Sequence, residues 1–244
     1  MLFDFGDTLV LTDRWNYDKC LKRLLESLHN DSVIISIPYE KFKHVYFRVR
    51  NQMYLESEKS LREVDFGQRI AKTLKSFNLN INGKNPAVKR AIECFLDAFI
   101  EDAHIESYAP TLLTRLKKEY KLGLVSNFAY APGLWKTLDR FDLTKFFEVV
   151  AISGELGYRK PHPRIFRKAL KTLKVRANKA VFVGDSLKAD IFGAKRLGLK
   201  TVLVENVGVR KNPYAIAGEL DPFPVKPDIA IPNLRKLAEI LDIL

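Results

Sequence analysis

The strongest constraint on the fold is an alternation of strand-like and helix-like segments that begins near Tyr108 and continues along the rest of the chain. The apolar runs of strand length are LGLV, FFEVVAIS, AVFVG, KTVLVEN and PDIAI. The segments with apolar residues at helical spacing are LLTRLKKEY, IFRKALKTL, DIFGAKRLG and NLRKLAEILDIL. Strands that alternate with helices predict a parallel sheet with helical crossovers, that is, a doubly wound α/β fold.

The opening segment, MLFDFGDTLV, is expected to belong to the same sheet. An isolated strand leaves the hydrogen-bonding groups of both its edges unpaired, so MLFDF needs neighbouring strands. Only three residues precede Asp4, so we expect a short first strand, which an upstream start would lengthen.

The segment from about Asp13 to His104 has a helical pattern and no alternation with strands. Its apolar stripes are Phe42, Val45, Tyr46, Val49 and Met53, and then Ile92, Phe95, Leu96 and Phe99. We interpret these stripes as the core of a helical bundle. The bundle follows the first strand, so we predict an all-α cap at residues 14–106, inserted into a core domain of residues 1–13 and 107–244. VIISI is expected to be a loop before a helix, and GVRKNPYAIAGELDPFPVKPD a long surface loop.

Composition narrows the class of protein. The chain is 47% hydrophobic and 29% charged, and no apolar run approaches the roughly 18 residues of a transmembrane helix. Asp4 and Asp7 interrupt the first apolar stretch, so we expect no signal peptide. Cys20 and Cys94 lack the spacing of a metal motif and are expected to be reduced thiols, with a cytoplasmic location as the default.

The net charge of +12 comes from 41 Lys and Arg against 29 Asp and Glu. These basic residues are spread along the chain instead of forming one tail, which is typical of a solvated surface. The spread therefore favours a solvated surface over a nucleic-acid partner, and the charge is compatible with attraction of small phosphorylated substrates. Because no apolar run is long enough to cross a membrane, we expect no membrane partner.

Chemistry is expected at one edge of the predicted sheet. Ligands of open parallel sheets bind beyond the carboxyl ends of the strands, so polar residues that follow the strands should meet there. The residues expected at this edge are Asp4, Ser126, Asn127, Lys160, Asp185 and Asp190. Taken singly, each has an ordinary structural alternative, such as a helix cap, a turn or an exposed loop lysine. Together these side chains could form a catalytic site.

Three carboxylates in one crevice, from Asp4, Asp185 and Asp190, raise one another's pKa unless a cation neutralises them. A set of oxygen ligands favours a hard ion, with Mg²⁺ as the first choice. Lys160 would supply a fixed positive charge, and Ser126 with nearby N–H groups would hold anionic oxygens. These parts suit phosphoryl transfer through an aspartyl-phosphate. His162 is expected to be structural.

Four segments of the chain resemble the four motifs of the haloacid dehalogenase-like (HAD) hydrolase superfamily. They are FDFGDTL, LVSNF, the lysine of YRKPHP and VGDSLKAD, and they occur in the order of that superfamily. The helical insertion lies where its C1-type cap is placed, so the resemblance covers nearly the whole chain. It implies a Rossmann-like α/β core and a hydrolase, most often a phosphatase.

The resemblance also implies roles for individual residues. Asp4 would be the nucleophile that becomes phosphorylated, and the residues that would bind Mg²⁺ are Asp4, Gly6 through its carbonyl, Asp185 and Asp190. The residues that would bind the transferred group are Ser126, Asn127 and Lys160.

The first motif departs from the usual pattern of phosphatases in this superfamily, D-x-D-x-T, in which the second acid protonates the leaving group. Here Gly6 occupies that position and the acid is displaced to Asp7. Either Gly6 lets Asp7 reach the substrate as a catalytic acid, or the enzyme works without one.

This departure keeps two alternatives open. One is a 2-haloacid dehalogenase-like or phosphonatase-like hydrolase that cleaves a carbon–halogen or carbon–phosphorus bond. The other is a catalytically weak nucleic-acid-binding protein. The paired aspartates of GDSLKAD favour a metal site, and we therefore predict Mg²⁺-dependent hydrolysis of a small phosphorylated metabolite.

Overall fold

A computed structural model describes residues 1–33, 36–206 and 223–241. The chain forms two compact units, which are described one at a time: Met1–Asp13 with His104–Leu244, and Arg14–Ala103. Parts of two expected loops, residues 34–35 of VIISI and 207–222, lie outside the described residues, as do residues 242–244.

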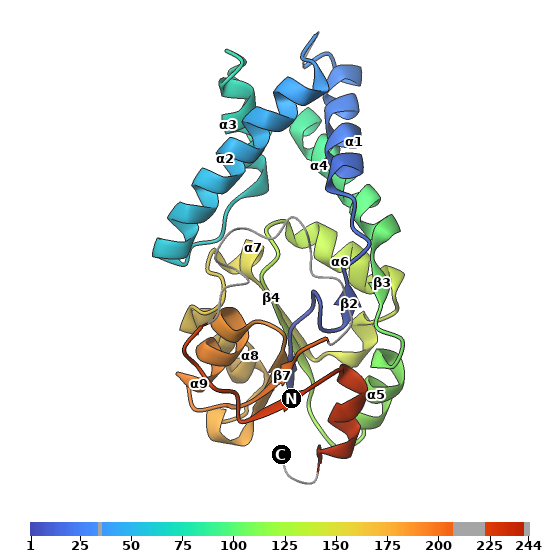
Figure 1. Ribbon diagram of the computed structural model, residues 1–244, viewed down its shortest axis with the longest axis vertical. Coiled ribbons are helices and arrows are strands. Elements are labelled where there is room, and N and C mark those ends of the chain that lie inside the picture. Colours follow the sequence, from blue (N-terminus) through green and yellow to red (C-terminus); the bar gives the residue numbers. More distant parts are fainter. Residues whose placement is uncertain (34–35, 207–222, 242–244) are drawn as a thin grey trace. The chain divides into compact units, whose positions relative to one another are not determined.

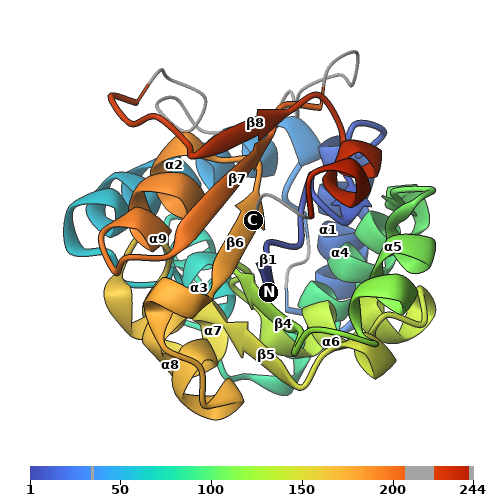
Figure 2. The same cartoon turned by 90° about the horizontal axis from the view of Figure 1, so that it is seen from below.

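The first unit is built on a parallel sheet, as the alternation of segments predicts (Figure 2). Within the described residues it has six strands in the order β5-β4-β1-β6-β7-β8. In chain order they are β1 (Leu2–Phe3), β4 (Gly123–Ser126), β5 (Val149–Ile152), β6 (Val181–Gly184), β7 (Lys200–Val204) and β8 (Ile229–Ile231). The short strand β1 is central, because Leu2 pairs with Gly123 on one side and with Phe182 on the other. The predicted doubly wound α/β fold is confirmed.

Helices cover both faces of this sheet (Figure 2). On one side lie α5 (Ala109–Leu116) and α6 (Ala131–Arg140), and on the other α8 (Pro163–Leu173) and α9 (Gly193–Lys195). The remaining helical elements of the unit are α7 (Ser153–Leu156), a π-helical turn (Leu187–Phe192) and 3₁₀ turns at Thr144–Phe146, Ala177–Lys179 and Leu234–Glu239. A small antiparallel pair, β2 (Val10–Leu11) with β3 (His104–Ile105), completes it.

Close packing of α9 explains the glycine at position 193, three residues after the fourth motif. The ring of Phe166 on α8 meets that of Phe182 on β6 at 5.2 Å between centroids. A Cβ atom on Gly193 would lie 2.7 Å from the Phe166 ring and 3.0 Å from the backbone of Pro161. Only glycine therefore allows the chain to approach α8 so closely at this point.

The last expected helix is shorter and tighter than the sequence pattern predicts. In the described part of NLRKLAEILDIL, which ends at residue 241, the chain forms a 3₁₀ turn at Leu234–Glu239 instead of an α-helix. The two buried residues of the turn, Leu234 and Leu237, are three positions apart. A 3₁₀ helix places residues at that spacing on one face, so the turn buries both side chains without a longer helix.

The second unit consists of helices, as expected (Figure 1). They are α1 (Tyr17–Asn30), α2 (Tyr39–Ser60), α3 (Phe66–Lys75) and α4 (Pro86–Asp102). Polar side chains mark several starts: Asn16 accepts from the backbone N–H of Lys19, and Asp65 from that of Gln68. Helix α2 begins directly after Pro38.

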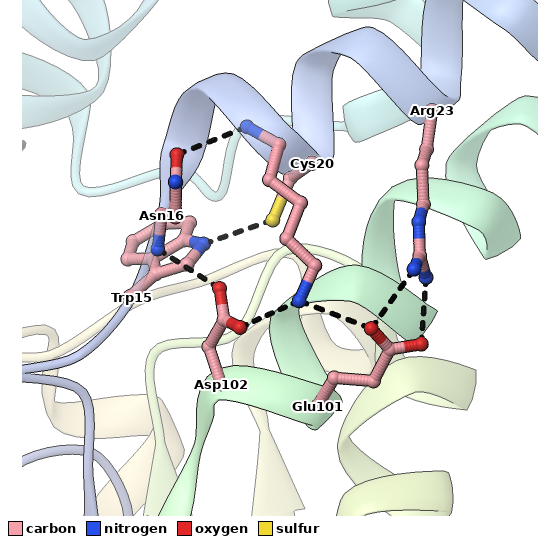
Figure 3. Close-up of polar contacts among 7 residues, drawn as sticks. Trp15, Asn16, Cys20, Arg23, Glu101 and Asp102 are labelled. Atoms are coloured by element: carbon pink, nitrogen blue, oxygen red, sulfur yellow. Dashed lines mark hydrogen bonds and ion pairs between the residues drawn. The ribbon is translucent and has the colours of Figure 1, made fainter.

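The start of α1 is fastened to the end of α4 by a charged network (Figure 3). Asp102 accepts from the backbone N–H of Asn16 at 3.0 Å and from Lys19 Nζ at 2.6 Å. Arg23 donates two hydrogen bonds to the carboxylate of Glu101, at 2.7 and 2.9 Å, and Lys19 lies 3.0 Å from Glu101. Such bidentate pairs fix the relative register of two helices.

The thiol of Cys20 lies inside this junction (Figure 3). Trp15 Nε1 donates to Cys20 Sγ at 3.1 Å, and burial raises the pKa of this thiol to about 12. A thiol with such a pKa stays protonated and is a poor nucleophile. Both Cys20 and Cys94 are free cysteines.

Across the described residues, the structure contains no helix with both the length and the apolar character that crossing a membrane requires.

Candidate active site

The carboxyl edge of the central strands gathers the residues expected there from the sequence. Asp4 directly follows β1, Ser126 is the last residue of β4, and Asp185 directly follows β6. These three strands are neighbours in the sheet, so their ends meet. Lys160 comes from the loop before α8, and Asp190 from the π-helical turn after β6.

Lys160 joins two of the carboxylates. Its ammonium group donates to Asp4 Oδ1 and lies 2.7 Å from Asp190 Oδ1, and the whole residue is only 3% exposed. Burial acts to lower the pKa of Lys160, but the negative charges of Asp190 and Asp4 more than offset this and raise it above its ordinary value. The lysine therefore remains a cation at neutral pH.

Asn127 holds the backbone of that lysine in place. Its Oδ1 accepts from the Lys160 N–H at 2.6 Å, and its Nδ2 donates to the Lys160 carbonyl at 3.1 Å. The side chain thus acts as a clamp between the loop after β4 and the loop that carries Lys160. Next to it, His162 caps α8, because its Nδ1 accepts from the N–H of Arg164 at 3.2 Å.

The three carboxylates Asp4, Asp185 and Asp190 form one cluster. Each has an oxygen within 4.8 Å of an oxygen of the others. Burial, followed by the charges of Asp4 and Asp190, raises the pKa of Asp185 well above its ordinary value. Burial likewise raises the pKa of Asp190 to about 6, against the lowering effect of Lys160. The crowding expected from the sequence is therefore present.

This cluster fits a hard divalent cation. Three carboxylates face one ammonium group, so the ionised cluster has an excess of negative charge that a divalent cation would balance. Asp190 Oδ2 accepts from the N–H of Ser186 at 3.0 Å, whereas the buried Asp190 Oδ1 has no hydrogen-bond partner apart from the ion-pair contact with Lys160. An all-oxygen donor set is the one that Mg²⁺ prefers. The carbonyl of Gly6 as a further ligand stays a prediction.

The loop from Asp4 to Thr12 is fastened by Asp7. This residue has a left-handed backbone, with φ of 52°, and its Oδ1 accepts from both the N–H and the hydroxyl of Thr12, at 2.9 and 2.8 Å. Its N–H donates to the carbonyl of Val10 at 2.8 Å, and its own carbonyl accepts from Asn206 Nδ2. The geometry therefore favours a structural task for the Asp7 carboxylate, and its role as a catalytic acid stays a prediction.

Two residues near the site are not among those expected from the sequence. Thr8 is fully buried, and its hydroxyl donates to Asp185 Oδ1 at 3.4 Å. Its place in FDFGDTL, directly after the displaced acid, is the signal that could have identified it. Asn206 follows β7 and reaches the loop of the first motif, and no local pattern in the sequence indicates this contact.

Substitution of Lys160 tests the charge balance of the cluster. Lys160→Met leaves Asp4 and Asp190 buried without their cation, so we expect the free energy of unfolding to fall by about 3 kcal/mol at pH 7 without metal. Urea unfolding measures the change. The control is Lys195→Met, which removes a half-exposed partner of Asp228. Equal losses in the two variants would contradict the proposed importance of Lys160.

Comparisons with known proteins identify the family of this chain. Residues 1–204 match the family model described as haloacid dehalogenase-like hydrolase. A curated relative, glyceraldehyde 3-phosphate phosphatase from Pyrococcus furiosus, is 40% identical over 132 residues, which cover 53% of this chain and 51% of the relative. The match therefore spans about half of the length of that relative.

Two solved structures share the fold over nearly the whole chain. One is a 2-haloacid dehalogenase from Pseudomonas syringae, with a TM-score of 0.66, 23% identity and coverage of 99% of this chain and 97% of that one. The other is a HAD phosphatase from Thermococcus onnurineus, with a TM-score of 0.65, 22% identity and coverage of 98% and 96%. At these identities the structures establish the fold alone. The family model, which matches most of the chain, shows that this chain belongs to the haloacid dehalogenase-like hydrolase family.

Proposed function

We propose that this protein is a Mg²⁺-dependent phosphatase that hydrolyses a small phosphorylated metabolite through an aspartyl-phosphate on Asp4. The observation that carries the proposal is the grouping of Asp4 with Asp185, Asp190 and Lys160 at the carboxyl edge of the sheet. The name of the Pyrococcus furiosus relative, glyceraldehyde 3-phosphate phosphatase, supports a substrate of this size.

In the proposed reaction Asp4 acts as the nucleophile. One of its carboxylate oxygens forms a bond to phosphorus while the bond from phosphorus to the leaving oxygen breaks. Water then attacks the phosphorus of the aspartyl-phosphate, which releases inorganic phosphate and restores the carboxylate. Lys160, fixed by Asn127, would neutralise charge on the transferred group. Ser126 would hold one of its oxygens.

Asp4, Asp185 and Asp190 would hold the Mg²⁺ ion, with the Gly6 carbonyl as a further proposed ligand. When bound, the ion would supply positive charge that lowers the repulsion between the phosphate and the attacking carboxylate. Thr8 would orient Asp185 through its hydroxyl.

The absence of an acidic side chain at position 6 indicates which leaving groups a substrate of this enzyme should have. Thr12 holds Asp7 Oδ1, so we expect the Asp7 carboxyl group to hold the loop and not to protonate the leaving oxygen. A correctly placed acid contributes about 10²–10⁴-fold to a rate, and a leaving group that carries its own negative charge well needs it least. We therefore expect acyl and aryl phosphates to react faster than alkyl phosphates.

The same glycine is the observation that favours the second candidate, hydrolysis of a carbon–halogen or carbon–phosphorus bond. With a halogenated substrate Asp4 would attack carbon and release halide. With a carbon–phosphorus bond it would attack phosphorus, and the carbon would leave as a carbanion that takes up a proton. The three clustered carboxylates favour the first candidate, because attack on a halogenated carbon needs no cation to neutralise a phosphate.

A substrate panel separates these candidates. Acetyl phosphate, p-nitrophenyl phosphate, glycerol 3-phosphate, phosphonoacetaldehyde and 2-chloropropionate would each be tested with Mg²⁺ and with EDTA. We expect release of phosphate from the phosphate esters and anhydrides that depends on Mg²⁺. Halide release that persists in EDTA would establish that the protein is a dehalogenase. No turnover of any substrate, together with salt-dependent retention on RNA or DNA, would support a binding protein instead.

A further inference from the structure

The helical unit contains a buried arginine without a counter-ion. Arg69 on α3 is 4% exposed, and in the described part of the chain no carboxylate pairs with it. Its Nη1 donates to the Tyr46 hydroxyl at 3.3 Å, while its Nε and Nη2 are buried and have no hydrogen-bond partner. Buried charges are ordinarily paired, so this guanidinium is exceptional.

Aromatic rings surround this guanidinium. Its Cζ lies 4.9 Å from the centroid of the Phe66 ring and 5.2 Å from that of Tyr54. A second buried arginine, Arg50 on α2, lies 5.7 Å from the same Tyr54 ring and 5.3 Å from the Tyr17 ring. We call Tyr17, Tyr46, Arg50, Tyr54 and Arg69 the arginine–tyrosine cluster.

Ring faces offset part of the charge, but they do not provide hydrogen-bond acceptors for N–H groups in the plane of the guanidinium. The other arginines of this unit for which the structure shows ion pairs are on its surface and face carboxylates: Arg23 with Glu101, and Arg90 with Asp31. The cluster thus places Arg69, whose Nε and Nη2 have no hydrogen-bond partner, close to a second buried arginine.

The unsatisfied atoms define a ligand geometry. Nε and Nη2 form one edge of the guanidinium, and two oxygens of a carboxylate or phosphate fit that edge with parallel hydrogen bonds. The remaining nitrogen, Nη1, already donates to the hydroxyl of Tyr46. That hydroxyl also lies 2.8 Å from the hydroxyl of Tyr17. The two Arg69 atoms are buried, whereas Tyr54 of the cluster and the neighbouring Phe47 are partly exposed.

We propose that the helical unit binds an oxyanion, the carboxylate or phosphate group of a small molecule, on the Nε and Nη2 edge of Arg69. Arg50 adds a second positive charge to the site, and the tyrosine rings shield both cations from water. The proposal does not depend on the reaction proposed for Asp4, because it concerns binding within the helical unit alone.

Arginine side-chain NMR tests the proposal on the full chain. Protein labelled with ¹⁵N-arginine is titrated in EDTA with malonate and, separately, with inorganic phosphate, and sodium chloride at matched ionic strength is the reference. The Nε–H signal of Arg69 is assigned by its loss in Arg69→Met. We expect this signal to shift and saturate with malonate, with phosphate or with both, which also identifies the preferred group. A signal that shifts no more than in sodium chloride overturns the proposal.

Two variants distinguish anion binding from a structural role. We expect Arg69→Met to weaken anion affinity at least about tenfold, because the two parallel hydrogen bonds are lost. Arg90→Met removes a surface arginine paired with Asp31 and should leave that affinity within about twofold of the wild type. Without anion, Arg69→Met should melt no lower than the wild type, because it removes a buried charge that lacks a counter-ion.

A lower melting temperature for Arg69→Met combined with unchanged anion affinity would show that the arginine is purely structural and would overturn the proposal. Arg69→Lys covers the case in which the methionine variant does not fold. It keeps the charge and loses the planar edge, so its affinity should also fall about tenfold. An affinity equal to that of the wild type would contradict bidentate binding.

Discussion

Asp4→Asn is expected to lower the rate of phosphate ester hydrolysis by at least about 10³-fold, because an amide cannot form the covalent bond to phosphorus. The substitution is close in shape, and Lys160 can still donate to the amide oxygen, so the fold should persist. Initial rates with p-nitrophenyl phosphate in Mg²⁺ measure the loss. Intact-protein mass spectrometry after acid quenching should detect a phosphoryl adduct in the wild type and none in Asp4→Asn.

The control for this experiment is Asp228→Asn in the same unit. Asp228 accepts from Thr201 and pairs with Lys195 at 2.8 Å, remote in sequence from all four motifs. Asp228→Asn should change the free energy of unfolding more than it changes the rate of phosphate ester hydrolysis. Turnover by Asp4→Asn close to that of the wild type would refute the proposed nucleophile. Loss of activity in both variants, with loss of the folded signal in circular dichroism, would show that unfolding caused it.

Gly6→Asp is expected to increase the hydrolysis of an alkyl phosphate such as glycerol 3-phosphate by about 10²-fold, because it supplies the missing acid for the leaving oxygen. The structure has room for it: a Cβ atom on Gly6 would meet no heavy atom within 4 Å, and the residue does not have a left-handed backbone. p-Nitrophenyl phosphate, whose leaving group needs no proton, should gain little.

Gly6→Asn is the matched control, because it has the same size and cannot donate a carboxyl proton. The pH dependence of kcat/KM is a further readout, and Gly6→Asp should gain a decline toward higher pH as its new carboxyl group loses the proton. Equal effects of the aspartate and asparagine variants would attribute any change to the backbone instead of to acid catalysis. No gain for the alkyl phosphate would indicate that another group already acts as the acid.

The Asp7→Asn substitution tests whether Asp7 acts as the acid that protonates the leaving group. The asparagine Oδ1 can still accept from the N–H and hydroxyl of Thr12, so the loop should keep its shape. If the carboxylate only fastens this loop, rates for alkyl phosphates should stay within about tenfold of the wild type. A loss of about 10²-fold confined to poor leaving groups would instead identify Asp7 as the acid.

Much of the fold could be predicted because periodicity and strand length are local properties of the sequence. The alternation after Tyr108 required a parallel sheet, and the unpaired edges of MLFDF required it to join that sheet. The pairing of Leu2 with both Gly123 and Phe182 satisfies that requirement. The prediction of an α-helix was wrong for Leu234–Glu239, because burial of two leucines three positions apart needs only a 3₁₀ turn.

The residues that reach the carboxyl edge of the sheet could be predicted from the sequence, because that position follows from where each strand ends. The contacts of these side chains could not be predicted and are seen only in the folded protein. The ion pairs of Lys160, the Asn127 clamp and the attachment of Asp7 to Thr12 depend on how loops bend. The unpaired edge of Arg69 likewise depends on which side chains of α2 and α3 meet. Such contacts join residues distant in the chain, and no local pattern specifies them.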